Sequence, residues 1–170
     1  MGDQLKATGL DFGTIIAFVA PGFITLLALA YHVPTAQAWI TAAGQQEPNV
    51  GGFLFALLAS LALGIAVSGA RSLLLDDRTT VIDWSALDAD KLGRLVTLRD
   101  NYFRYYQFYA NTFLAVILWG TGRLLAQGPR LTFVGFVVWV AVLAILFASA
   151  RRQLAEYRSG VGTLVRAPTG

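Results

Sequence analysis

The sequence predicts an all-α integral membrane protein, a four-transmembrane-helix bundle whose third and fourth helices extend into the cytoplasm. The 170-residue chain is 56% hydrophobic and only 14% charged, whereas about a quarter of the residues in a soluble domain are charged. Four windows contain no Asp, Glu, Lys or Arg: 12–46, 48–70, 105–122 and 131–150. Each window holds a run close to the roughly 20 residues that a helix needs to cross a bilayer. We therefore expect the chain to lie in a lipid bilayer.

The basic residues predict the orientation of this bundle. Of the 13 Lys and Arg residues, only Arg123 and Arg130 lie at the end of the third span or between the third and fourth spans. All the others lie in the N-terminal segment, in or beside the connection between spans two and three, or after the last span. Because Lys and Arg gather on the cytoplasmic side of membrane proteins, both termini are expected in the cytoplasm. The expected location is the bacterial inner (plasma) membrane.

We predict a single membrane domain with a cytoplasmic part. The four spans are expected at 12–31, 52–74, 105–126 and 131–150. A helical extension at 76–104 and a C-terminal tail at 151–170 are expected on the cytoplasmic side.

The first predicted span carries Pro21 and Gly22 near its middle. Proline has no backbone N–H, and its ring clashes with the carbonyl four residues earlier, which is that of Ala17. The helix should therefore kink or break there. Such a position can belong to a discontinuous helix that lines a pore or forms a hinge. Proline is also common in membrane helices, so a plain packing kink is the alternative.

The chain offers few residues for metal or redox chemistry. His32 is the only histidine, and there is no cysteine, so neither a thiolate metal site nor a disulfide is possible. No carboxylate pair lies near His32, which we interpret as a structural or interfacial side chain. We expect no metal and no cofactor.

The second predicted span has small residues at four-residue spacing, namely Ala56, Ser60, Gly64 and Ser68. Small residues on one helical face let helix backbones approach closely in lipid. This pattern predicts a helix-packing face. Its partner is either a helix of the same chain or a neighbouring protomer.

The stretch from Asp88 to Gln127 reads as one helix of about 60 Å, roughly half of it in the bilayer. Four polar residues share one face, because they are separated by four, three and four positions: Asp100, Arg104, Gln107 and Asn111. Asn111 lies beyond the aromatic belt of this helix, inside hydrocarbon, where its amide needs an internal partner. This polar stripe is expected either to line a pore or to join helices.

The last predicted span carries no charge and is followed by Arg151 and Arg152. Gly128 and Pro129 predict a tight turn before this span, which makes the third and fourth spans antiparallel neighbours. Downstream, Gly160 and Gly162 are expected to end the helix.

No catalytic constellation or phosphate-binding glycine loop can be assembled, so we do not expect an enzyme. The leading expectation is a small protein that oligomerises in the lipid bilayer and acts as a channel or a gated membrane effector or sensor with a cytoplasmic helical input. The alternative is a membrane anchor or scaffold that docks a soluble cytoplasmic protein, conceivably in a prokaryotic defence or stress system. The basic residues follow the membrane rather than cluster, so no nucleic-acid partner is expected.

Overall fold

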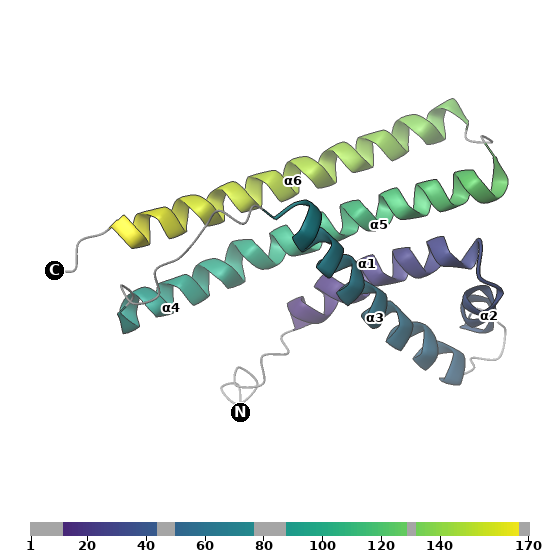
Figure 1. Cartoon of the computed structure of the whole chain (residues 1–170), viewed down its shortest axis with the longest axis horizontal. Coiled ribbons are helices and arrows are strands. Elements are labelled where there is room, and N and C mark those ends of the chain that lie inside the picture. Colours follow the sequence, from purple (N-terminus) through teal and green to yellow (C-terminus); the bar gives the residue numbers. More distant parts are fainter. Residues whose placement is uncertain (1–11, 44–49, 77–87, 129–131, 167–170) are drawn as a thin grey trace.

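The computed structural model describes residues 12–43, 50–76, 88–128 and 132–166, and these segments are helical with no strand (Figure 1). In chain order the elements are α1 (Phe12–Ala30), α2 (Pro34–Ala43), α3 (Val50–Leu74), α4 (Ala89–Leu98), the π-helical segment η3 (Arg99–Phe103), α5 (Arg104–Gln127) and α6 (Phe133–Arg166). Of the residues used in the predictions, Pro129 and Arg130 lie outside these segments, as do residues 77–87 of the predicted extension and 167–170 of the predicted tail.

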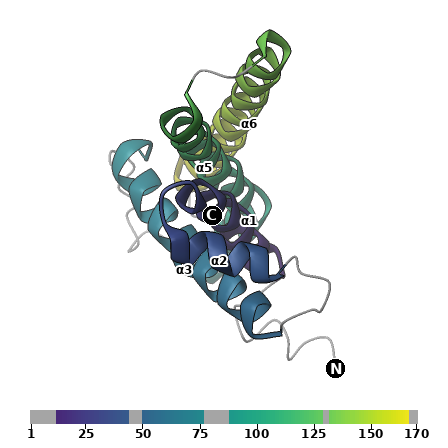
Figure 2. The same cartoon turned by 90° about the vertical axis from the view of Figure 1, so that its right-hand side faces the viewer.

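The core lies where α1 packs between α3 and α5. The short helix α2 covers the end of this core by packing on α1 and α3. Helix α6 packs chiefly on α5, and Figure 2 shows the end of the α5–α6 hairpin projecting away from α1 and α3. The bundle therefore consists of a core formed by α1, α3 and α5, with α6 added on α5 as the second helix of a long hairpin.

The segment from α4 to α5 is one continuous helical rod from Ala89 to Gln127 (Figure 1). Asp88 caps its start, because its carboxylate accepts a hydrogen bond from the Lys91 backbone N–H at 2.8 Å. The segment η3 interrupts the regular α-helix, and the Arg104 N–H donates to the Arg99 carbonyl, five residues earlier. Such π-turns insert one extra residue and change the register of the side chains that follow.

The helix end predicted at Gly160 and Gly162 is wrong. Helix α6 continues through both glycines to Arg166. A Cβ atom at Gly160 would lie 2.7 Å from Leu98 Cδ2 of α4. Gly160 therefore permits a close approach between α4 and α6 instead of ending the helix.

Two of the described helices, α3 and α6, are long and apolar enough to cross a membrane, and residues Ile16–Ala30 of α1 form a shorter apolar helix. Core helices of soluble proteins can have the same composition, but they are mostly buried. Here only 28% of the apolar window of α3 and 6% of that of α6 are buried. The described residues therefore leave most of the apolar surface of these two helices uncovered.

Candidate functional site

The predicted small-residue face of α3 lies against α1. Ala56, Ser60 and Gly64 are buried, and Ser68 is partly buried. A Cβ atom at Gly64 would collide with the backbone of Phe18 in α1. The Ser60 hydroxyl donates to the Ala56 carbonyl at 2.7 Å, so it is satisfied within α3. This face is occupied by a helix of the same chain.

Pro21 and Gly22 lie at the same contact. Helix α1 runs through them without the break that the sequence suggests as one outcome. A Cβ atom at Gly22 would collide with the Ser60 carbonyl oxygen and would lie 2.7 Å from the Gly64 nitrogen. The Thr25 hydroxyl donates to the Pro21 carbonyl at 2.9 Å. The backbones of α1 and α3 are thus in direct contact at Gly22 and Gly64.

Asn111 reaches the carbonyl that Pro21 leaves without a helical partner. Pro21 has no N–H, so the Ala17 carbonyl cannot form its usual bond within α1. Asn111 of α5 is fully buried, and its Nδ2 donates to the Ala17 oxygen at 3.5 Å, the long end of the hydrogen-bond range. Its Oδ1 has no partner among the described residues. Asn111 therefore joins α5 to α1 inside the protomer.

The predicted polar stripe runs from a partly exposed end into this contact. Asp100 in η3 and Arg104 at the start of α5 form an ion pair at 3.2 Å. Gln107 is partly buried, and Asn111 is in the core. The structure thus brings Asp100 and Arg104 together and places Asn111 separately, against α1.

His32 ties the far end of α5 to the corner between α1 and α2. Its Nε2 lies 3.1 Å from the Gly122 carbonyl oxygen. A Cβ atom at Gly122 would lie 3.2 Å from the Ala28 carbonyl oxygen, so α1 and α5 are also close here. His32 therefore occupies a packing position at this corner.

A buried ion pair, which sequence reasoning missed, closes the other end of the core. Arg71 at the end of α3 is only 3% exposed, and its Nη1 lies 2.9 Å from Asp76 Oδ1. The same carboxylate oxygen accepts a hydrogen bond from the Tyr106 hydroxyl of α5. The Arg71 guanidinium lies 5.1 Å from the centroid of the Tyr106 ring and 5.9 Å from that of Phe103. We call these four residues the Arg71 cluster; it fastens α3 to η3 and α5.

Aromatic contacts continue the Arg71 cluster to α6. The Phe103 ring lies 5.7 Å from the Tyr106 ring and 5.1 Å from the Tyr157 ring of α6, centroid to centroid. Three helical elements, α3, η3 and α5, therefore meet around the Arg71 guanidinium, and α6 contacts them through Tyr157. In the sequence the only signal for this cluster is the five-residue spacing of Arg71 and Asp76, since Tyr106 lies 30 residues further on.

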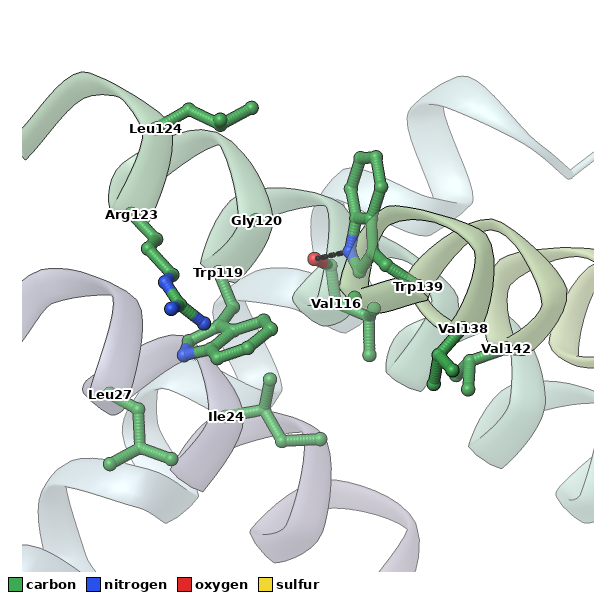
Figure 3. Close-up of a pocket in the computed structure, with 11 residues that line it drawn as sticks. Ile24, Leu27, Val116, Trp119, Gly120, Arg123, Leu124, Val138, Trp139 and Val142 are labelled. Carbon is green, nitrogen blue, oxygen red and sulfur yellow. Dashed lines mark hydrogen bonds between the residues drawn. The ribbon is translucent and has the colours of Figure 1, made fainter. Parts of the chain in front are cut away.

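Two of the grooves on the surface lie between helices described above. One has a volume of about 500 Å³ and lies between α1, α5 and α6, near the connection between α5 and α6 (Figure 3). The other, of about 530 Å³, lies between α4 and the last turns of α6 and includes Gly93, Thr97 and Gly160. Among the described residues no cluster of three or more His, Cys, Asp or Glu side chains could hold a metal ion.

No protein-family model, no curated protein and no solved structure matches this chain. Its function is therefore inferred from the geometry alone.

Proposed function

We propose that this chain is a small, non-enzymatic protein with four membrane spans and cytoplasmic termini, which oligomerises and works as a gated membrane effector or channel. The exposure of α6 carries the proposal. An apolar helix whose membrane-length window is only 6% buried needs lipid or another copy along nearly its whole length. Large side chains such as Phe136, Ile145 and Phe147 are among those left exposed.

The Arg71 cluster supports a cytoplasmic input. In the proposed topology it lies where the bundle leaves the cytoplasmic face of the bilayer, and it joins α3 to η3 and α5, with Tyr157 of α6 against Phe103. A movement of η3, or of Tyr157 of α6 against Phe103, would change the surroundings of Arg71. A buried guanidinium that loses its carboxylate is strongly destabilised, so the cluster has the properties of a two-state connection between a cytoplasmic partner and the core.

A conducting path would have to lie between copies of the chain. Asn111, the membrane-level end of the predicted stripe, is fully buried against α1. Asn111 therefore acts within the protomer, and the exposed face of α6 remains for contacts between protomers.

The first test is the mass of the particle in nanodiscs, followed by ion flux in liposomes. We expect a defined oligomer that conducts. Since the chain has no cysteine, Ile145→Cys on α6 provides a background-free probe, and we expect oxidation to link two copies through it. Leu58→Cys on the exposed face of α3 is the matched control. A monomer that carries no ions would overturn the proposal.

A second candidate function is that of a membrane anchor for a soluble partner. The observation that favours it is the groove between α4 and α6, which in the proposed topology lies outside the bilayer. Glycines on both walls, Gly93 and Gly160, keep it open, and Asp90 and Arg94 border it. The anchor function predicts a monomer that carries no ions and binds a soluble protein. Thr97→Trp should abolish this binding, and Val140→Trp on α6 should leave it unchanged.

A further inference from the structure

The groove between α1, α5 and α6 has apolar walls and a single charged residue. Apart from Arg123, the lining consists of apolar, aromatic and glycine residues, among them Ile24, Leu27, Val138 and Val142. Its volume of about 500 Å³ falls within the roughly 300–1,000 Å³ typical of sites for small ligands. These walls suit a hydrocarbon chain, and the arginine suits an anion.

Arg123 is held at this groove by an aromatic ring. Its guanidinium lies 5.8 Å from the centroid of the Trp119 ring, and Figure 3 shows the two side chains lying side by side. Among the residues that the structure describes, no Asp or Glu forms an ion pair with Arg123. A guanidinium presents several N–H donors in a fork that matches the oxygens of a phosphate. The charge at this position therefore complements a phosphate group.

Trp139 forms a rigid part of the opposite wall. Its Nε1 donates to the Val116 carbonyl of α5 at 3.3 Å, as drawn in Figure 3. A Cβ atom at Gly120 would lie 2.5 Å from Trp139 Cζ2, so only glycine lets the indole lie this close to α5. Because the indole N–H is already satisfied, the ring offers an apolar surface to a ligand.

The groove fits within the depth of one leaflet. In the proposed topology, on which this inference rests, Arg123 lies one turn from the outer end of α5, at the level of the headgroups. Along α6 the lining runs from Gly135 to Val142, roughly 11 Å at a helix rise of about 1.5 Å per residue. The hydrocarbon of one leaflet is roughly 15 Å thick.

We propose that this groove binds an anionic phospholipid from the outer leaflet, with the phosphate paired to Arg123 and one acyl chain lying along Trp119, Trp139 and Val142. The occupant is a lipid of the surrounding bilayer, since the groove opens between helices whose other faces already require hydrocarbon. Figure 3 shows the side chains that form it.

The test uses the groove tryptophans as the probe. In the full chain carrying Trp39→Phe and Trp84→Phe, fluorescence comes only from Trp119 and Trp139. The protein is reconstituted into phosphatidylcholine vesicles with a small, equal fraction of either brominated phosphatidylglycerol or brominated phosphatidylcholine. We expect the anionic lipid to occupy the groove about fivefold more strongly, the preference that one arginine near anionic headgroups provides. Arg123→Gln should abolish this preference.

Two further variants separate the groove from general surface charge. Val138→Phe should fill the groove and reduce quenching by both lipids, and Arg123→Gln should then have no further effect. Val140→Phe, on the same helix but outside the lining, and Arg94→Gln, at the other end of the molecule, should leave the preference unchanged. Equal quenching by the two lipids in the parent protein overturns the proposal. So does quenching that falls as the protein density in the vesicle rises, because a second copy would then occupy the groove.

The outcome also distinguishes this site from the membrane topology beneath it. A protein that fails to float with the vesicles contradicts the proposed topology itself. A protein that floats with them but shows no headgroup preference contradicts only the lipid site.

Discussion

Replacing Gly64 with alanine should separate α1 from α3. The new Cβ atom would lie 2.7 Å from the Phe18 carbonyl carbon and 3.1 Å from its Cα, with the carbonyl oxygen closer still. Carbon atoms pack best at about 3.5–4.0 Å, so the helices would have to move apart by about 1 Å. The obstacle is backbone, which cannot turn away as a side chain can. Overpacking of this kind costs about 1–3 kcal/mol.

Gly69→Ala is the matched control, because it lies in the same helix and a Cβ atom there meets nothing within 4 Å. Without a clash, alanine should stabilise the helix by about 0.5–1 kcal/mol relative to glycine. Because both variants gain the same helix propensity, they should differ by the cost of the clash, about 1–3 kcal/mol in the free energy of unfolding, measured by SDS titration in mixed micelles. Equal stabilities would refute the close contact. A change in particle mass without a loss of protomer stability would instead place Gly64 between protomers.

Two further predictions concern the cytoplasmic end of the molecule. Asp76→Asn should destabilise the protein by about 2–4 kcal/mol in the same titration, because Arg71, whose side chain is 4% exposed, loses its charged partner; Asp90→Asn, in an exposed pair, should cost less than about 1 kcal/mol. Equal effects of these two variants would contradict the Arg71 cluster. Gly160→Ala should increase amide hydrogen exchange in α4, since the new methyl group must displace the flexible Leu98 side chain, whereas Gly162→Ala, which meets nothing within 4 Å, should leave exchange in α4 unchanged or slower. Faster exchange with Gly162→Ala alone would contradict the packing described for α4 and α6.

The helical segments follow from one-dimensional patterns. Charge-free windows and small-residue spacing are local properties, and the bounds of α3 and α5 differ from the expected spans 52–74 and 105–126 by only one or two residues. The carbonyl freed by Pro21 and the amide of Asn111 are each visible in the sequence as groups that need a partner. The Asn111 amide meets the Ala17 carbonyl because of the way α1 crosses α5. No local sequence pattern encodes this crossing.

The features that sequence reasoning missed have the same origin. Glycine is typical of a helix end, so the sequence alone suggests that α6 stops at Gly160. Only the position of Leu98 in α4 shows that Gly160 allows α4 and α6 to pack closely. The segment η3 has no distinctive residues of its own. The charge of Arg71 is visible in the sequence, while its burial depends on Phe103 and Tyr106, which come from a distant part of the chain.

The pairing of Asn111 with Ala17 also constrains the order of biogenesis. The two residues are 94 positions apart, so at about 5–20 residues per second the ribosome needs roughly 5–20 s to deliver the amide after the carbonyl. During that interval the Ala17 carbonyl has no partner from α5. The contact of Gly22 with Ser60 and Gly64 becomes available well before Asn111 is made. The early α1–α3 pair can thus hold the first helix in place until α5 arrives to complete it.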